Sequence, residues 1–471
     1  MYATARWTVV TLSLAACGPA RPPAPSPAPG RVATIDARFA AARGDSVAVL
    51  ALLAHLPKGG DLHSHLSGAI RAESYVRWAA ADGLCYVSAR ASLTPPPCGD
   101  SSVSARALVT DPALANTAID AWSTRGWRPG NGTGHDHFFA TFGKFGPATR
   151  GRLGDMLAEA TAHAGAQRVS YLELMVTLDE GIANRLARQI VWNGDFGAAR
   201  RRLAQLGLRD SLRVVTARLD SAETRRRTLL HCDDVGAEPG CRVVVRYLYQ
   251  VIRALPPAEV FAQIVTGFEL AELDSRVVGL NLVAAEDGAV AMRDFPLHMR
   301  MIEYLHGGRP RMNISLHAGE LSDTLVGSAA PRSHIRESIR VAGARRIGHG
   351  VDLLRDPDPA GLLRLMASRG VLVEIGLTSN DVILGVRGDR HPLRAYLAAG
   401  VPVAFATDDE GVSRSSLTHE MLRAVQDQRI SYGELRTAVR NSIAYSFAED
   451  SVKVRLQTEL ERALAEFEAA P

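Results

Sequence analysis

The chain has 471 residues, of which 46% are hydrophobic, and its 54 Lys and Arg against 50 Asp and Glu give a formal net charge of +4. This length suits one large domain with additional segments, and the apolar fraction is that of a globular protein with a sizeable core. The basic residues are scattered and form no stripe with interleaved aromatic residues, which argues against nucleic acid as a partner.

The N-terminal residues have the features of an export signal. The mostly apolar run 7–16 has the length of a signal-peptide core and is too short to span a bilayer as a mature helix. It ends in Leu14-Ala15-Ala16-Cys17, which resembles the lipobox of bacterial lipoproteins, where the cysteine is lipidated and becomes the new N-terminus. We therefore expect residues 1–17 to be a lipoprotein signal and Cys17 to anchor an exported protein to a membrane of the cell envelope. The alternative is a plain cleaved signal peptide.

The next segment, 18–32, is rich in proline and predicts an extended linker between the anchor and a folded domain at 33–471. Apart from Cys17, the cysteines form two pairs that are close in sequence, Cys85 with Cys98 and Cys232 with Cys241. An oxidising compartment favours disulfides. Three pairings are possible in principle and proximity favours the two local ones, whereas four free thiols are the alternative.

Short β-branched or apolar runs alternate with helical patterns, such as 257–271 and 359–368, along most of the chain. This alternation predicts a parallel sheet, and eight strands predict an α/β fold of the (β/α)₈ TIM-barrel type. A doubly wound open sheet would place a Gly-rich phosphate loop after the first strand, and the sequence has none there. The predicted strands are 60–65, 171–177, 212–218, 277–283, 313–317, 346–349, 371–375 and 403–407.

Two intervals are too long for a minimal barrel. The interval at about 75–146, after the first strand, predicts an inserted subdomain that contains Cys85 and Cys98. The interval 219–242 predicts a smaller insertion or an extended loop that contains Cys232 and Cys241.

The first predicted strand ends in Asp61-Leu62-His63-Ser64-His65. Alternate side chains of a strand face the same way, so His63 and His65 project together at the end where barrel enzymes bind their ligands. Two imidazoles placed in this way are a natural start for a metal site. The segment His135-Asp136-His137 has the same spacing but lies in a Gly-rich stretch with no strand before it, and we expect it to be a loop.

Three other predicted strands also end in polar residues, namely His317, His349 and Asp408. Three imidazoles and one carboxylate suit zinc, which lowers the pKa of a bound water to roughly 7. Glu320 follows His317 and is a candidate proton donor, and His349 is available as a second base or positioning group. The chain has only three lysines, none at a strand end where it could bridge two metals, so we expect one zinc ion per subunit.

Five segments together resemble the motifs of adenosine deaminases, in the same order along the chain. The secretion signal and the cysteine-containing insertion are similar to those of the secreted adenosine deaminase growth factor branch. The segments are 56–68 (LPKGGDLHSHLSG), 317–320 (HAGE), 346–350 (RIGHG), 378–380 (TSN) and 407–409 (TDD).

The resemblance implies a role for each matching residue. His63, His65, His317 and Asp408 would bind zinc, Glu320 would donate a proton to purine N1, His349 would act on the zinc-bound water, and Asp409 would hydrogen-bond purine N7. Two substrate-binding positions depart from the family pattern. Ser67 stands where the cytosolic type has an acidic residue that contacts the ribose, and Ala284 stands where the family has a glycine against purine N3.

The resemblance therefore implies zinc-dependent deamination of adenosine or 2′-deoxyadenosine to inosine or 2′-deoxyinosine and ammonia. The departures at Ser67 and Ala284 keep open a deaminase of another amino-heterocycle, such as adenine, a modified adenosine or a pterin. A surface lipoprotein that binds purine nucleosides without turnover is the remaining alternative.

Overall fold

The computed structural model describes residues 29–309, 312–328 and 332–470. Eight strands form its central sheet in the order β1-β5-β6-β7-β8-β9-β10-β11. The backbone N–H of Asp408 donates to the carbonyl of His63 at 2.9 Å and that of His65 donates to the carbonyl of Asp408 at 2.9 Å, so the chain after β11 pairs with β1 and closes the ring. The fold is a (β/α)₈ barrel. The strands are β1 (Gly59–His65), β5 (Val169–Val176), β6 (Val244–Ile252), β7 (Val277–Val283), β8 (Asn313–Ala318), β9 (Arg346–His349), β10 (Leu372–Ile375) and β11 (Val403–Phe405).

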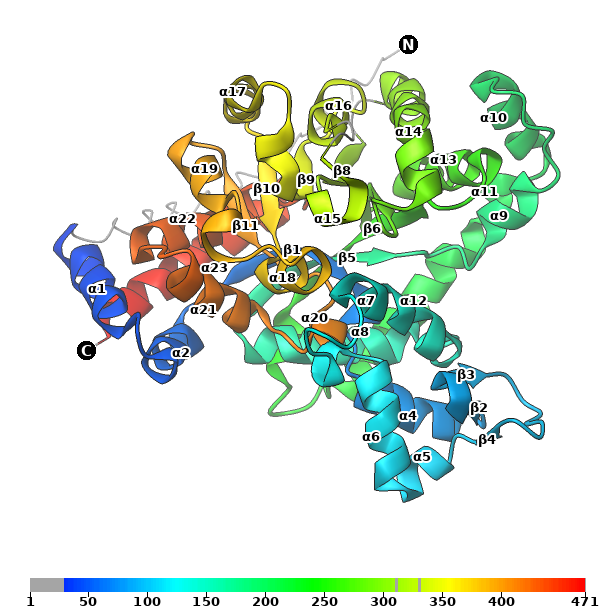
Figure 1. Cartoon of the computed structure of the whole chain (residues 1–471), viewed down its shortest axis with the longest axis horizontal. Coiled ribbons are helices and arrows are strands. Elements are labelled where there is room, and N and C mark those ends of the chain that lie inside the picture. Colours follow the sequence, from blue (N-terminus) through cyan, green and yellow to red (C-terminus); the bar gives the residue numbers. More distant parts are fainter. Residues whose placement is uncertain (1–28, 310–311, 329–331, 471) are drawn as a thin grey trace, which may run out of the picture.

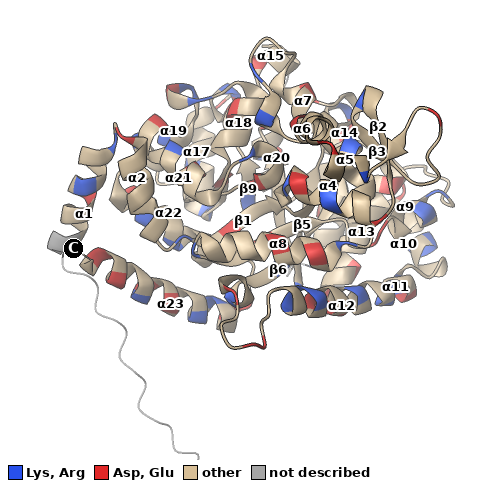
Figure 2. Ribbon diagram, turned by 90° about the horizontal axis from the view of Figure 1, so that it is seen from below, with Lys and Arg blue, Asp and Glu red and all other residues tan. Residues whose placement is uncertain are grey.

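Helices surround this sheet, and the first and last helices lie together at one side of the barrel (Figure 1). Basic and acidic residues are interspersed along the helices seen in Figure 2. Apart from α3 to α7, the helices are α1 (Pro29–Ala42), α2 (Ser46–His55), α8 (Leu153–Ala166), α9 (Ile182–Ala187), α10 (Phe196–Gln205), α11 (Leu208–Ser211), α12 (Arg213–Leu229), α13 (Pro257–Leu273), α14 (Ala289–Gly308), α15 (Asp323–Val326), α16 (His334–Arg340), α17 (Pro359–Arg369), α18 (Leu377–Leu384), α19 (Leu393–Ala398), α20 (Glu410–Ser413), α21 (Leu417–Asp427), α22 (Tyr432–Ala444) and α23 (Asp450–Ala469).

The predicted third strand, 212–218, is wrong. These residues begin helix α12, whose buried residues Val215, Leu219, Ala222 and Arg226 recur every three or four positions and so line one face of a helix. The short β-branched run at Val214–Thr216 misled the prediction. The third strand of the barrel is β6, and most of the interval 219–242 is the body of α12 followed by a turn.

The connection between β1 and β5 holds much more than one helix. Its antiparallel sheet has the order β3-β2-β4, and with α5 and α6 it projects from the barrel at the lower right of Figure 1. The chain then returns through α7, which begins at Gly134 because the Thr133 hydroxyl caps it by accepting from the N–H of Asp136 at 3.0 Å. The predicted loop at His135–His137 is therefore helical. The elements of the connection are α3 (Leu66–Ala69), α4 (Ala72–Ala81), β2 (Cys85–Val87), β3 (Ser92–Thr94), β4 (Val103–Ser104), α5 (Ala107–Thr110), α6 (Pro112–Ala121) and α7 (Gly134–Phe145), followed by α8, which leads into β5.

The predicted signal sequence and Cys17 lie outside the described residues, as does most of the predicted linker. Helix α1 begins at Pro29, so the last residues of the interval 18–32 are helical. Within the described parts of the chain, no helix combines the length and the apolar character needed to cross a membrane.

The two local disulfides are present. Cys85 is bonded to Cys98, which ties β2 to the loop after β3, and Cys232 is bonded to Cys241, which closes the turn after α12. Each bond therefore stabilises a connection on the outside of the barrel.

Replacing Cys85 and Cys98 together by serine should lower the free energy of unfolding by about 3 kcal/mol, because closing a short loop removes conformational entropy from the unfolded chain. Urea denaturation of the oxidised protein and of the variant measures this difference. The Cys232→Ser/Cys241→Ser variant should lose a similar amount, since its loop is of comparable length, with sequence separations of 9 and 13 residues. Equal stability of the variants and the unsubstituted protein would contradict the prediction.

Candidate active site and metal centre

All four predicted metal ligands meet at one end of the barrel. His63 and His65 lie at the end of β1, His317 lies near the end of β8, and Asp408 follows β11. One donor atom of each lies within 4.8 Å of the others. The Nε2 atoms of His63 and His317 are 3.0 Å apart, and the Nε2 atoms of His65 and His317 are 3.2 Å apart. Oδ1 of Asp408 lies 3.4 Å from Nε2 of both His63 and His65.

The opposite ring nitrogen of each of these imidazoles contacts a side-chain oxygen. These contacts join Nδ1 of His63 to Oε2 of Glu374 at 2.7 Å, Nδ1 of His65 to Oε1 of Gln250 at 3.2 Å, and Nδ1 of His317 to Oδ1 of Asn281 at 2.8 Å.

These oxygens determine where the imidazole protons lie. A carboxylate or amide oxygen can only accept, so each Nδ1 carries the hydrogen and each neutral ring keeps an unshared electron pair on Nε2. Three such pairs that face one another at about 3 Å repel unless a cation lies between them. Together with the Asp408 carboxylate they form a donor set of three nitrogens and one oxygen, which fits a divalent metal ion.

Behind His63 lies a buried charged network. Arg346 pairs with Glu374 and with Glu173, and none of these three side chains is exposed to solvent. Two carboxylates against one guanidinium leave negative charge beside the ligands. Burial lowers the pKa of His63, but Asp408 and Glu374 outweigh burial and raise that pKa to about 10. The two carboxylates therefore favour positive charge at Nε2 of His63, and a bound cation would supply that charge in place of a proton.

Glu320 is held by the turn that follows β8. Its backbone N–H donates to Oε2 of Glu286 at 2.8 Å, and the N–H of Gly319 donates to Oε1 of the same carboxylate at 3.0 Å. Gly319 has φ +81°, and a Cβ there would lie 2.5 Å from Asp352. Burial, followed by the charges of Asp408 and Glu286, raises the pKa of Glu320 well above its usual value. Burial therefore favours the protonated form of Glu320, whose Oε1 lies 3.6 Å from Nε2 of His349.

The carboxyl group of Asp409 occupies the space that a side chain at position 68 would fill, and Gly68 leaves that space open. A Cβ at Gly68 would lie 1.5 Å from Oδ1 of Asp409, so only glycine leaves room for this carboxyl group. Burial, followed by the charge of Asp408, raises the pKa of Asp409 well above its usual value. A buried Oδ1 of Asp409 has no hydrogen-bond partner within the described part of the chain, so this group is available to a ligand.

Three non-glycine residues at the mouth adopt a left-handed backbone. Ala284, His349 and Asp408 have φ of +80°, +69° and +57°. Such conformations cost free energy for a residue with a Cβ and occur preferentially at functional sites. The value at Ala284 also accounts for the glycine that the resemblance places at this position, since glycine adopts positive φ without strain.

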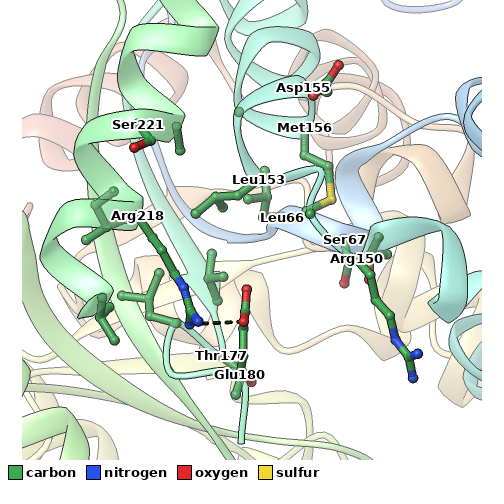
Figure 3. Close-up of a pocket in the computed structure, with 18 of the residues that line it drawn as sticks. Leu66, Ser67, Arg150, Leu153, Asp155, Met156, Thr177, Glu180, Arg218 and Ser221 are labelled. Carbon is green, nitrogen blue, oxygen red and sulfur yellow. Dashed lines mark ion pairs between the residues drawn. The ribbon is translucent and has the colours of Figure 1, made fainter. Parts of the chain in front are cut away.

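A cavity of about 1070 Å³ lies between α8, α12 and the end of β5 (Figure 3). Gln250, which contacts His65, and Ser67 are among the residues that line it, so the cavity borders the metal-ligand cluster. Arg218 pairs with Glu180 at 2.9 Å across its wall. The volume is at the upper end of the range for small-molecule sites and exceeds what a purine base requires.

The other histidine pair does not form a metal site. His135 contacts Asp287 through Nε2 at 3.0 Å, whereas Nε2 of His137 contacts the carbonyl of Ser123 at 2.9 Å. The lysines also lie elsewhere: Lys58 precedes β1 at the opposite end of the barrel, where its ammonium donates to three backbone carbonyls.

A family model described as adenosine deaminase matches residues 216–463, which is more than half of the chain. The chain belongs to the adenosine deaminase family. It is similar to the adenosine deaminase of Serratia proteamaculans, with 32% identity over 189 residues that make up 40% of this chain and 54% of that protein. The chain thus spans about half the length of this relative.

Two solved structures share the fold of this family member. The adenine deaminase of Arthrobacter aurescens superposes with a TM-score of 0.57 at 18% identity over 87% of this chain and 99% of the other. The N6-methyl-AMP deaminase of Arabidopsis thaliana superposes with a TM-score of 0.58 at 21% identity over 88% and 99%.

Sequence reasoning missed the residues that orient the ligands of this adenosine deaminase homologue. Asn281 and Glu374 are polar residues inside the otherwise apolar strands β7 and β10, and that contrast was a usable signal. Gln250 lies on β6, the strand that was not predicted. No local signal reveals its contact with His65.

Replacing Glu374 by glutamine should weaken divalent-metal binding about 10- to 100-fold, because the oxygen that orients His63 loses its charge. Competition with a chromogenic chelator measures the affinity. The matched control is Glu173→Gln, which removes the other carboxylate partner of Arg346 and touches no imidazole. Both variants should lose stability, but only Glu374→Gln should lose metal affinity. Equal affinities in the two variants would show that Glu374 does not act through His63.

Proposed function

We propose that this protein hydrolyses the amino group of adenosine or 2′-deoxyadenosine, giving inosine or 2′-deoxyinosine and ammonia, with one zinc ion per chain. The observation that carries the proposal is the cluster of three imidazole nitrogens and the Asp408 carboxylate within 4.8 Å of one another, next to the buried Glu320 and His349. Membership of the adenosine deaminase family supports the same reaction.

The donor set suits zinc, because zinc takes nitrogen and oxygen ligands in a four-coordinate arrangement. His63, His65, His317 and Asp408 would hold the ion. When bound, zinc lowers the pKa of a coordinated water to about 7 and so supplies hydroxide at neutral pH.

The protein's own groups provide the proton and the orientation. Water adds across the C6–N1 bond of the purine: its oxygen bonds to C6, N1 takes a proton from Glu320, and the proton that the water gives up restores Glu320. The amino group then leaves C6 as ammonia with the proton of the new hydroxyl group, which restores the ring as the 6-oxopurine. The raised pKa of Glu320 favours the protonated form that this step requires. A protonated Asp409 can likewise donate to N7, which has only an electron pair to offer.

A second candidate is the deamination of another amino-heterocycle, such as adenine, a modified adenosine or a pterin. Ser67 and Ala284 favour it, since both depart from the family pattern on the substrate side of the site, and the cavity exceeds the size of a nucleobase. Proteins of the same fold include an adenine deaminase and an N6-methyl-AMP deaminase, so the fold alone does not choose among these substrates.

We also propose that the protein is exported and held in the cell envelope through a lipid on Cys17. The two disulfides support this location, because disulfides persist in oxidising compartments.

The test of the proposed reaction is the ultraviolet absorbance of adenosine and 2′-deoxyadenosine incubated with the zinc-loaded protein. We expect a shift towards the 6-oxopurine that a chelator abolishes. The Glu320→Gln variant should lower kcat by about 10²- to 10⁴-fold, since glutamine cannot donate the proton, while bound zinc is retained. Turnover of a panel compound but of neither nucleoside would favour the second candidate. Nucleoside binding without turnover of any panel compound would favour a binding protein.

Exchanging Ala284 for glycine should lower the KM for adenosine without changing kcat if the purine lies against this residue, because the methyl group is removed. The melting temperature should stay the same or rise, since glycine relieves the strain of φ +80°. The matched control is Ala285→Gly at the next position, which has no positive φ and should only destabilise the protein. A higher KM in Ala284→Gly than in the parent would place the substrate elsewhere.

A further inference from the structure

A chain of three hydrogen bonds leads from a backbone amide to His349. The N–H of Leu393 lies 3.2 Å from Nδ1 of His391, and Nε2 of His391 lies 3.1 Å from Oδ1 of Asn380. Nδ2 of Asn380 lies 2.9 Å from Nδ1 of His349. The side chains of His391, Asn380 and His349 are all buried. We call this set the His391–Asn380 relay.

The direction of each hydrogen bond follows from the first. A backbone N–H can only donate, so Nδ1 of His391 is an acceptor and the hydrogen of this neutral ring lies on Nε2. Burial, followed by the charges of His349 and Arg423, lowers the pKa of His391 to about 3, so the ring is neutral. Its Nε2–H needs an acceptor, and the only acceptor that Asn380 offers is Oδ1.

The amide of Asn380 is thereby oriented, and it determines the state of His349. Its NH₂ group faces Nδ1 of His349, so that nitrogen accepts and carries no hydrogen. A doubly protonated His349 would set two donors against each other at 2.9 Å, which this contact disfavours. The hydrogen of His349 therefore lies on Nε2. This atom has no hydrogen-bond partner among the described residues and lies 3.6 Å from Oε1 of Glu320.

We propose that His391 and Asn380 are positioning residues that fix His349 as its Nε2–H tautomer, so that His349 donates a hydrogen bond to the attacking oxygen and does not act as a base. This inference rests on the proposed deamination for the identity of that oxygen, but the tautomer itself does not depend on the substrate. The imidazoles of the metal ligands carry their hydrogen on Nδ1, so hydrogen-bond partners divide the four rings into two classes with opposite tautomers.

The relay also bears on the number of metal ions. Donor atoms of Glu320, His349 and Asp408 lie within 4.8 Å of one another and form a second potential cation site. A ring nitrogen that carries hydrogen has no electron pair for a metal, so His349 cannot serve as a ligand in this tautomer. The relay therefore confines the metal to the site of His63, His65, His317 and Asp408.

Asn380→Asp tests the relay most directly, because it replaces the NH₂ donor by an oxygen of nearly the same size. Both oxygens of the new carboxylate can only accept hydrogen bonds, so the hydrogen of His349 should move to Nδ1 and leave Nε2 without a hydrogen. His391→Leu removes the origin of the relay, whereas His391→Gln can still accept from Leu393 and donate to Asn380. His298→Leu is the control for the loss of a buried imidazole, since neither ring nitrogen of His298 has a partner in the described parts of the chain.

The tautomers are measured on the full chain, loaded with zinc and labelled with ¹⁵N in the histidine rings, by NMR correlation of ring nitrogens with ring protons. His349 is assigned from the signal that disappears in His349→Gln. The expected result is a hydrogen on Nε2 in the parent protein and in His391→Gln, and on Nδ1 in Asn380→Asp. A parent His349 with its hydrogen on Nδ1 would overturn the proposal.

The kinetic test separates positioning from a general loss of structure. Asn380→Asp and His391→Leu should lower kcat by about 10²- to 10⁴-fold, with KM, bound zinc and the far-ultraviolet spectrum little changed. His391→Gln and His298→Leu should retain kcat within a few fold.

Full activity of both Asn380→Asp and His391→Leu would overturn the proposal. If the parent turns over no panel compound and yet shows the Nε2–H tautomer, the relay stands and the proposed function fails. If Asn380→Asp does not fold, the comparison of kcat between His391→Leu and His391→Gln tests the relay.

Discussion

Three imidazole nitrogens with unshared electron pairs point at one another in the mouth of this barrel, and the surrounding structure keeps them there. Such an arrangement is repulsive by itself, so the ring orientations must be imposed from outside. Glu374, Gln250 and Asn281 impose them by accepting the hydrogens on the far sides of the rings. These partners lie on strands β10, β6 and β7, and the site is consequently a property of the whole sheet and not of one loop.

Closure of the barrel brings the fourth ligand to this group. Asp61 accepts from the N–H and the hydroxyl of Thr407 at 3.1 and 2.6 Å, and its other oxygen accepts from the N–H of His63 at 3.2 Å. One buried carboxyl group therefore fixes both the start of the ligand run on β1 and the residue before Asp408. The contact that joins the first and last strands therefore also sets the distance between the metal ligands on β1 and Asp408.

The sequence predicted the parts of this structure that depend on local pattern. The ends of β8, β9 and β11 were recognisable because a polar residue ends or follows an apolar run, β1 was recognisable from the alternation of His63 and His65, and the motif order linked these strands. The start of α12 was misread, since three β-branched residues in a row resemble a strand until the burial period of the whole helix is considered. The His391–Asn380 relay could not be found in this way. His349 ends β9, Asn380 lies in α18 and His391 precedes α19, so their hydrogen bonds depend on how three separate segments pack together.

The reacting centre and the substrate side of the site obey different constraints. At the centre, the direction of each hydrogen bond permits few residue types, because a donor in place of an acceptor changes a tautomer and with it the chemistry. On the substrate side, shape and volume permit more variation, and Ser67 and the strained Ala284 both lie there. The inserted helix α7 reaches the same region, since His135 pairs with Asp287, three residues beyond Ala284. A change in the insertion can therefore alter the loop against which we expect the purine to lie while leaving the ligands, Glu320 and His349 in place. This separation allows one barrel to keep the groups that we assign to the proposed deamination and still depart from the family pattern at Ser67 and Ala284.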